Sequence, residues 1–206
     1  MFVKICGITR PADASAAVEA GANALGFVFW PNSPRFVDPY AARAIVGKLP
    51  PFVVPVGVFV NQPVEYVRGV AALVGLGAVQ LHGDEDPAYL AGIRYAVIKA
   101  VSVGDRPDQL DQWSPRTMLL LDVRDPVARG GTGRTIDWTA AASIARRRRS
   151  LLAGGLSPDN VAEAIALVQP YGIDVSSGVE RSPGVKDPAR IRALFEAVNG
   201  HHPSRS

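Results

Sequence analysis

The chain has 206 residues, of which 48% are hydrophobic and 20% charged. This composition is typical of a folded globular protein and excludes disorder as the main state. The 22 basic and 19 acidic residues give a formal net charge of +3. A chain of this length fits either two small domains or one closed α/β domain.

Eight short apolar runs of β-strand type recur along the chain, each followed by a turn and an alanine-rich amphipathic stretch. They lie at residues 2–6, 24–29, 53–60, 78–81, 95–101, 117–123, 150–155 and 172–177. Such alternation predicts a parallel sheet with right-handed crossovers. Units of about 25 residues suit a single-domain α/β fold of the (β/α)8 TIM-barrel type. A doubly wound sheet is the alternative, but the Gly-rich fingerprint after its first strand is missing.

Helices are expected between the runs. The patterns lie at 12–21, 38–49, 63–74, 86–93, 137–149, 157–170 and 187–200, with a weaker one at 105–113. Asp38, Ser157 and Asp187 are candidate N-caps because a proline follows each of them. Gly21, Gly92 and Gly172 fall where a helix must end before a strand. We therefore expect the barrel to span residues 1–199, with a disordered tail at 200–206.

The single cysteine, Cys6, excludes an intramolecular disulfide. No Cys/His cluster has the spacing of a metal site, so no metal is expected. The first residues lack the features of a secretory signal, and no apolar run approaches the length that spans a bilayer. These features favour a cytoplasmic protein that has no membrane partner.

Polar side chains gather at the carboxyl ends of the predicted strands, where a barrel carries its chemistry. They are Lys4, Cys6, Arg35, Asn61, Gln80, His82, Lys99, Asp122, Arg124, Asp174, Ser176 and Ser177, and the glycine pair Gly154 and Gly155 lies at the same end. A purely structural barrel would have little reason to place polar groups repeatedly at one end.

Two of these strand ends suggest a phosphate site. Gly154 and Gly155 allow a close backbone approach to an anion, and Ser176, Ser177 and Gly178 follow the last strand with hydroxyl and N–H donors. The loops after strands seven and eight are where barrels commonly bind phosphate, although each motif alone fits an ordinary turn equally well. The Gly-rich segment 130–135 fits a lid over the ligand or a mobile surface loop.

Cys6 and Asp122 lie on strands one and six, on opposite sides of the expected barrel mouth. A thiol acts as a base only where its surroundings stabilise the thiolate, to which Lys4 can contribute. Burial of Asp122 after an apolar run favours its protonated form. Cys6 also fits an inert buried thiol. His82 fits an acid–base group or a polar loop residue.

Four arginines in a row, Arg146 to Arg149, allow a nucleic-acid patch. The run lies in the last turn of an expected helix, where cations complement the helix dipole and are solvated. We favour the solvated surface, and expect no nucleic-acid partner.

Several motifs together resemble the phosphoribosylanthranilate isomerase family. They are KICGIT (4–9), GFVF with SPRFV (26–37), GVFVN (57–61), VQLHG (79–83), LLLD followed by GGTGRTIDW, AGGLSPDNV, and DVSSGVE. The resemblance runs in order from Lys4 to about Phe195. The KICGIT, QLHG and DVSSGVE motifs together are highly specific.

The resemblance implies a cofactor-free Amadori rearrangement in tryptophan biosynthesis, with N-(5-phosphoribosyl)anthranilate as the small phosphorylated aminosugar substrate. It implies that Cys6 is the general base and Asp122 the general acid. Arg35 would face the anthranilate carboxylate, Asp174 would bond a ribose hydroxyl and His82 would contact substrate. Gly154, Gly155, Ser176, Ser177 and Gly178 would bind phosphate. Either a monomer or a homodimer is compatible with the sequence.

Two alternatives stay open at this point. The related isomerisation of an aminoimidazole carboxamide ribonucleotide, in histidine synthesis, usually uses two aspartates, so Cys6 argues against it. A non-catalytic phosphosugar-binding barrel would not need both Cys6 and Asp122.

Overall fold

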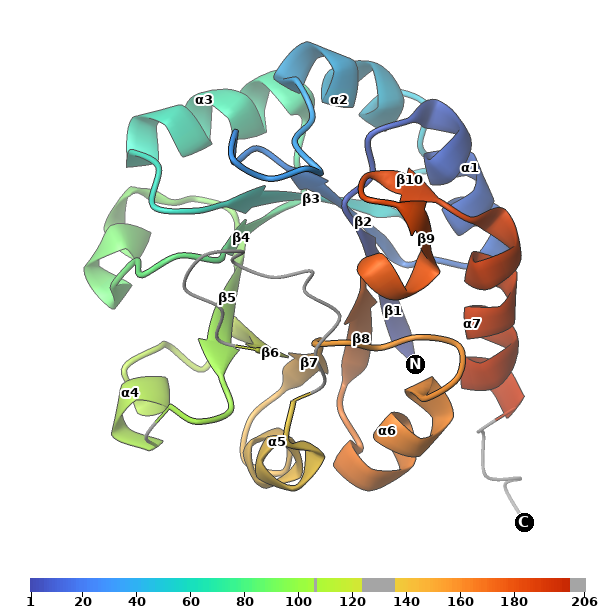
Figure 1. Ribbon diagram of the computed structural model, residues 1–206. Coiled ribbons are helices and arrows are strands. Elements are labelled where there is room, and N and C mark those ends of the chain that lie inside the picture. The colour runs from blue at the N-terminus through green and yellow to red at the C-terminus, as the bar shows by residue number, and fades with distance from the viewer. Residues whose placement is uncertain (106, 124–135, 201–206) are drawn as a thin grey trace.

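Eight parallel strands close into a barrel in chain order (Figure 1). The computed structural model describes residues 1–105, 107–123 and 136–200. The strands are β1 (Phe2–Cys6), β2 (Ala24–Val28), β3 (Val54–Phe59), β4 (Ala78–Leu81), β5 (Ala96–Ser102), β6 (Met118–Asp122), β7 (Ser150–Leu152) and β8 (Gly172–Val175). The predicted TIM barrel is therefore confirmed; seven strands lie within the predicted apolar runs, and β5 extends one residue beyond its run, to Ser102.

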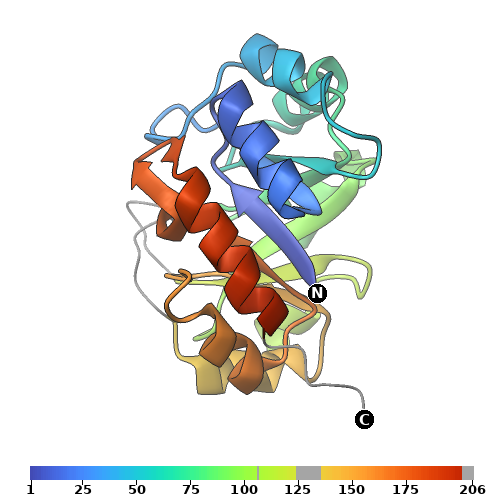
Figure 2. The same ribbon diagram turned by 90° about the vertical axis from the view of Figure 1, so that its right-hand side faces the viewer.

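Helices surround the barrel (Figure 1). The view in Figure 2 shows the last of them, near the C-terminus, lying across the outside of the strands. They are α1 (Pro11–Ala20), α2 (Pro39–Val46), α3 (Val64–Val74), the 3₁₀ helix η1 (Pro87–Gly92), α4 (Pro107–Asp111), α5 (Trp138–Ala145), α6 (Val161–Val168) and α7 (Pro188–Gly200). After β8 the chain forms a short 3₁₀ helix, η2 (Ser177–Val179), and a small antiparallel hairpin of β9 (Glu180–Ser182) and β10 (Val185–Lys186).

The core has two layers because side chains alternate between the faces of each strand. Ile5, Phe27 and Leu121 point outward and pack under the helices in the larger apolar cluster. Inside the barrel, a smaller cluster of Val56, Leu120 and other residues fills the lower interior. Burying side chains of this size contributes roughly 1.5–3 kcal/mol each.

Strand register places polar residues together at the upper end of the interior. Lys4 of β1 pairs in register with Asp174 of β8, and Cys6 pairs with Gly26 of β2. Lys4 and Cys6 are two residues apart, so they share the inward face of β1. The barrel interior thus changes from apolar to polar toward the carboxyl ends of the strands.

The fourth helical segment differs from the amphipathic helix predicted at 86–93. It is a 3₁₀ helix, capped by Asp86, whose carboxylate accepts from the Tyr89 N–H at 3.1 Å. A Cβ on Gly92 would lie 2.6 Å from a Val64 methyl group, so this short segment is pressed against α3. The weaker pattern at 105–113 becomes the short helix α4.

The helix ends follow the predictions in part. Asp38 and Asp187 accept hydrogen bonds from N–H groups of α2 and α7, and Gly21 ends α1 in the left-handed conformation. The N-cap prediction for Ser157 was wrong, because residues 157–160 form a turn and Asn160 is the N-cap of α6.

Of the other two predicted helix stops, one was right and one was wrong. The helical segment η1 ends at Gly92 as predicted, whereas Gly172 begins β8, and α6 already ends at Val168 with Gln169 as its C-cap at φ of 50°. Gly172 is needed for another reason: a Cβ there would lie 2.4 Å from the carbonyl oxygen of Phe2 on the adjacent strand.

The arginine run begins after α5 ends at Ala145, and so does not lie in the last helical turn as predicted. Arg146, Arg147 and Arg149 are exposed, as expected of a solvated surface. Arg148 differs, because its guanidinium donates to the carbonyl oxygens of Leu110, Trp113, Ser114 and Thr117 at 2.8–3.1 Å. One of the four arginines therefore fastens the chain before β6 to the chain before β7.

Three further predictions fall partly or wholly outside the described residues: the lid at 130–135, Arg124, and the tail, of which 201–206 are not described. Within the described part, α7 continues through Gly200. The helices of that part are all too short or too polar to cross a membrane.

Candidate active site

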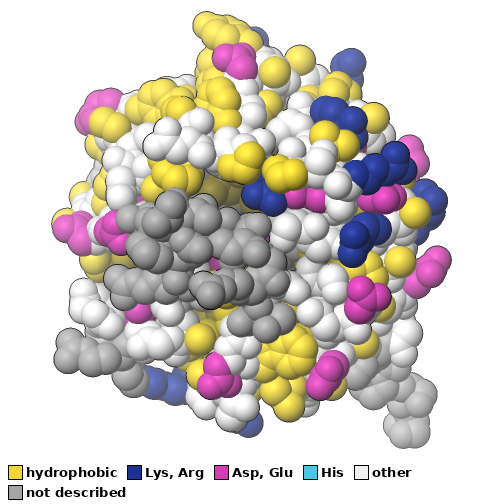
Figure 3. Space-filling view, in the orientation of Figure 1, with side chains coloured by type: hydrophobic (Ala, Val, Ile, Leu, Met, Phe, Trp, Pro, Cys, Tyr) yellow, Lys and Arg dark blue, Asp and Glu magenta, His cyan; other side chains and the backbone are white. Residues whose placement is uncertain are grey.

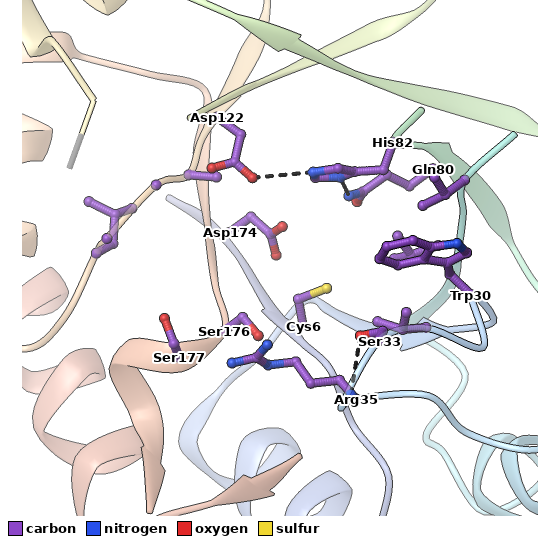
Figure 4. Close-up of a pocket in the computed structure, with 17 residues that line it drawn as sticks. Cys6, Trp30, Ser33, Arg35, Gln80, His82, Asp122, Asp174, Ser176 and Ser177 are labelled. Atoms are coloured by element: carbon purple, nitrogen blue, oxygen red, sulfur yellow. Dashed lines mark hydrogen bonds and ion pairs between the residues drawn. The ribbon is translucent and has the colours of Figure 1, made fainter. Parts of the chain in front are cut away.

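A pocket opens at the carboxyl ends of the strands, with an empty volume of about 730 Å³ that includes its open mouth. Its walls come from β1, β2, β3, β4, β6, β7 and β8 and the loops that follow them. The lining residues are Cys6, Val28, Trp30, Ser33, Arg35, Val58, Val60, Gln80, His82, Asp122, Ala153, Gly154, Gly155, Leu156, Asp174, Ser176 and Ser177. The close-up in Figure 4 shows the polar members pointing into this space.

The pocket brings together all the predicted site residues except Gly178. Gly178 lies just behind the wall, where its backbone touches the loop after β7. A Cβ at this position would lie 1.9 Å from the carbonyl oxygen of Leu156, so only glycine fits. Its place is explained by loop packing, independently of any ligand.

Cys6 ends β1 and lies at the floor of the pocket with 8% of its surface exposed. Burial raises the pKa of its thiol and the Asp174 charge adds to this rise, while the ammonium groups of Lys4 and Lys186 act in the opposite direction. Lys4 thus favours the thiolate as expected, although burial outweighs it. A Cβ on Gly26 would lie 2.6 Å from the Cys6 sulfur, so the neighbouring strand must have a glycine here.

Lys4 is fully buried, and its Nζ donates to Asp174 Oδ1 at 2.9 Å. Burial alone lowers the pKa of Lys4, but the carboxylate of Asp174 and the Cys6 thiolate more than offset this, so the pKa is raised. Lys4 therefore stays charged beside the thiol. The ion pair also fixes Asp174 in the pocket wall.

Asp122 ends β6 and faces His82, which follows β4. The two side chains are 3.4 Å apart between His82 Nε2 and Asp122 Oδ2. The other carboxylate oxygen accepts from the Val123 N–H at 2.7 Å, and His82 Nδ1 lies 2.8 Å from the amide nitrogen of Gln80 (Figure 4). Asp122 is thus held in a chain of hydrogen-bonding groups at the rim opposite Cys6.

Arg35 lines the pocket while its guanidinium makes a bidentate pair with Glu180, with N–O distances of 3.0 and 2.7 Å. Burial alone raises the pKa of Glu180, but hydrogen bonds from Arg35 and the charge of Lys186 lower it overall. Lys186 donates to Glu180 at 2.7 Å and to the Ser176 carbonyl oxygen at 3.2 Å. The β9–β10 hairpin therefore fixes Arg35 from behind.

Basic and acidic side chains lie next to one another on the surface above this hairpin (Figure 3). Two ion pairs adjoin the hairpin, Arg10–Asp13 and Arg181–Asp187; both arginines are exposed, whereas the Asp13 side chain is buried. The largely exposed Arg181–Asp187 pair contributes little to stability.

The loops after β7 and β8 form the other wall of the pocket. Gly154 and Gly155 line the pocket with φ of 80° and 66°, a conformation that favours glycine. The Ser176 hydroxyl is buried and has no hydrogen-bond partner among the described residues. A buried donor without a partner is costly, and a bound anion would satisfy it.

No group of three or more His, Cys, Asp or Glu side chains in the described part of the chain is arranged to hold a metal ion. Within that part, the pocket offers acid–base and hydrogen-bonding groups.

Comparison with known proteins identifies the family of the chain. A family model described as N-(5'phosphoribosyl)anthranilate (PRA) isomerase matches residues 3–197. The chain belongs to this family. The N-(5'-phosphoribosyl)anthranilate isomerase of Pelobacter propionicus is 52% identical over 194 residues, covering 94% of this chain and 93% of that protein.

Solved PRA isomerases share the fold over almost the whole length. A structure of monomers generated from the dimeric Thermotoga maritima enzyme is 40% identical, with a TM-score of 0.85 over 97% of this chain and 99% of that one. Another PRA isomerase, in complex with reduced 1-(o-carboxyphenylamino)-1-deoxyribulose 5-phosphate, is 42% identical, with a TM-score of 0.84 and the same coverage.

Sequence reasoning missed several residues that shape the pocket of this PRA isomerase family member. Trp30 lines it directly after β2, and Gln80 was noted only as a polar strand residue. Glu180, distant in sequence, pairs with Arg35, and Lys186 in turn pairs with Glu180. The DVSSGVE motif contains Glu180, so its acidic residue was the available signal.

Proposed function

We propose that this pocket converts N-(5'-phosphoribosyl)anthranilate into 1-(o-carboxyphenylamino)-1-deoxyribulose 5-phosphate, by acid–base chemistry that needs no cofactor. The reaction is the aldose–ketose isomerisation of tryptophan biosynthesis. Family membership over nearly the whole chain supports it. The observation that carries our assignment of roles is that Cys6 and Asp122 line one pocket from different strands.

Asp122 is the proposed general acid. It donates a proton to the ring oxygen of the furanose, the bond between that oxygen and C1′ breaks, and the nitrogen lone pair forms a Schiff base with C1′. Cys6, as thiolate, then removes the proton from C2′, and the electrons of that bond move toward the Schiff-base nitrogen to give an enolamine. The enolamine loses its hydroxyl proton and gains one at C1′ as it becomes the ketone. Each acid–base step of this kind contributes about 10²- to 10⁴-fold in rate.

The remaining polar groups are proposed to bind the two charged ends of the substrate. Backbone groups at Gly154, Gly155 and Gly178 and the hydroxyls of Ser176 and Ser177 would take the phosphate, whose charge would satisfy the Ser176 hydroxyl. Arg35 would pair with the anthranilate carboxylate through the guanidinium nitrogen that Glu180 does not bind. Asp174 would accept from a ribose hydroxyl, and His82 would contact the sugar near Asp122.

Cys6→Ser and Asp122→Asn test these roles. Each should lower kcat by about 10²- to 10⁴-fold, because one proton transfer loses its partner. Turnover is followed by the fluorescence change of the anthranilate group, and circular dichroism checks the fold. Arg147→Gln, on an exposed side chain, is the matched control and should keep the normal rate. A normal rate in either site variant would refute that residue's assignment.

We also propose that the chain forms a homodimer through the amino ends of its strands. Phe52 is 91% exposed just before β3, and Met1, Val54 and Tyr171 are exposed large apolar side chains at the same end. The Thermotoga maritima relative is described as dimeric, which supports the proposal. Light scattering after size exclusion should give twice the monomer mass, and a monomer mass at high protein concentration would refute it.

A cytoplasmic location is proposed as well. The lone cysteine and the biosynthetic reaction support it. Cell fractionation with activity as the marker tests it, and activity in a membrane or extracellular fraction would contradict it.

A further inference from the structure

We infer that Gln80 is a positioning residue that sets the proton arrangement of His82, and through His82 that of Asp122. The inference concerns a residue with no role in the mechanism above. It rests on the proposed role of Asp122 as the general acid. Three side chains carry it, on β4, in the loop after β4, and at the end of β6 (Figure 4).

Gln80 is well placed to fix the histidine. It is 1% exposed, and its amide nitrogen lies 2.8 Å from His82 Nδ1. An amide nitrogen only donates, so Nδ1 must accept and the single proton of the neutral ring must be on Nε2. That nitrogen faces Asp122 Oδ2 at 3.4 Å, so His82 presents its N–H to the carboxylate.

The arrangement suits a carboxylate. The Val123 N–H donates to Asp122 Oδ1, and His82 Nε2 faces Oδ2 at 3.4 Å, so an N–H group is directed at each oxygen. If Asp122 is protonated and directs its proton to His82, then Nε2 must accept and Nδ1 must carry the ring proton. Nδ1–H then needs an acceptor, which Gln80 supplies by turning its amide through half a revolution.

Glutamine suits this position because its amide has both a donor and an acceptor. The Gln80 Oε1 atom is buried and has no hydrogen-bond partner among the described residues, so within that part of the chain no second bond fixes the amide orientation. The His82 ring therefore decides which end of the amide faces it. The Gln80 amide can thus reverse its orientation each time Asp122 loses or regains its proton during turnover.

Two substitutions separate the functions of the amide. Gln80→Met keeps the length and removes both hydrogen-bonding groups, whereas Gln80→Glu introduces a carboxylate that only accepts, so that Nδ1 carries a proton in addition to the one on Nε2. We expect kcat to fall about 10- to 100-fold in each, as when other partners that orient a functional histidine are removed. KM should change little, and the pH dependence of kcat should shift in Gln80→Glu.

A spectroscopic readout distinguishes positioning from packing. The ¹⁵N chemical shifts of the His82 ring should show the proton on Nε2 in the unliganded protein, and protons on both nitrogens in Gln80→Glu. The chain has two other histidines, His201 and His202, so a His82→Asn sample assigns the signals by difference.

Gln62→Met is the matched control. Gln62 also makes short amide hydrogen bonds, to the Val60 N–H and the Phe29 carbonyl oxygen, but it does not line the pocket. Its loss should lower the melting temperature and leave the His82 shifts and the pH profile unchanged.

The role of Gln80 and the role of Asp122 can fail independently. A ring proton on Nδ1 in the unliganded protein, or Gln80 variants with normal kcat and pH profile, would overturn the role of Gln80. These results would leave Asp122 as the acid. A normal rate in Asp122→Asn would instead refute the proposed acid, while the ¹⁵N result would still report how Gln80 orients the ring.

Discussion

The two ends of the barrel use charged side chains differently. At the carboxyl ends of the strands, Lys4, Asp174 and Glu180 are buried and pair with other side chains around a pocket. At the amino ends, Arg148 is partly exposed and donates to backbone carbonyl oxygens. The carboxyl end therefore carries its buried charges around the pocket, and the amino end uses a charge to hold backbone segments together, a division common among barrels.

This difference predicts that substitutions at the carboxyl end affect both stability and activity. Lys4→Met leaves the Asp174 carboxylate without its partner in a nearly dry wall, and should lower the free energy of unfolding by about 3 kcal/mol. Chemical denaturation measures it. The double variant Lys4→Met/Asp174→Asn is the control and should recover most of the loss, because it leaves no uncompensated charge.

The pH dependence of kcat/KM in Lys4→Met tests whether Lys4 acts on the Cys6 thiol. Burial raises the pKa of Cys6, and Lys4 opposes that rise. Thiolate is present only above this pKa, so kcat/KM of the unmodified enzyme should increase with pH on its acidic limb. In Lys4→Met this limb should move to higher pH. A limb that stays in place, with the fold intact, would show that Lys4 does not act on the thiol.

A charged side chain at the amino end should affect stability alone. Arg148→Ala removes the donors of four carbonyl oxygens, and should lower the free energy of unfolding by about 2 kcal/mol. The kcat of the folded protein should stay normal, because no described pocket residue contacts Arg148. A large drop in kcat without a loss of stability would break the proposed division between the two ends.

The smallest effect on the monomer is expected from Phe52→Glu. Phe52 is almost fully exposed, so the free energy of unfolding of one subunit should change by less than about 0.5 kcal/mol. The introduced charge should nevertheless weaken the proposed dimer, which light scattering over a dilution series measures. An unchanged dimer would place the interface elsewhere.

The sequence predicted all eight strands because a strand buried on both faces has to be apolar along its length. It also predicted that Cys6 and Asp122 lie at the same end of the barrel, since parallel strands place their carboxyl ends together. Helix ends were harder. The segment Ser157–Asn160 contains several residues able to cap, and only the packed loop selects Asn160.

The interactions behind the pocket could not be predicted from the sequence. Arg35 and Glu180 are 145 positions apart, and they meet because the β9–β10 hairpin folds back over the end of the barrel. The Gln80–His82 contact is local, but its significance depends on Asp122 of β6, which is separated from β4 by one strand in the sheet and by about 40 residues in the sequence. Trp30 directly follows Phe29, which is fully buried, and nothing in the sequence around the two separates a pocket wall from a core position.

The contact between Gly178 and Leu156 constrains how this enzyme can be redesigned. The backbones of the loops after β7 and β8 touch there, with no room for a single additional carbon atom. An inserted residue or a borrowed loop on one side would therefore collide with the other. Anyone transplanting this wall of the pocket into another barrel should move the two loops as one unit.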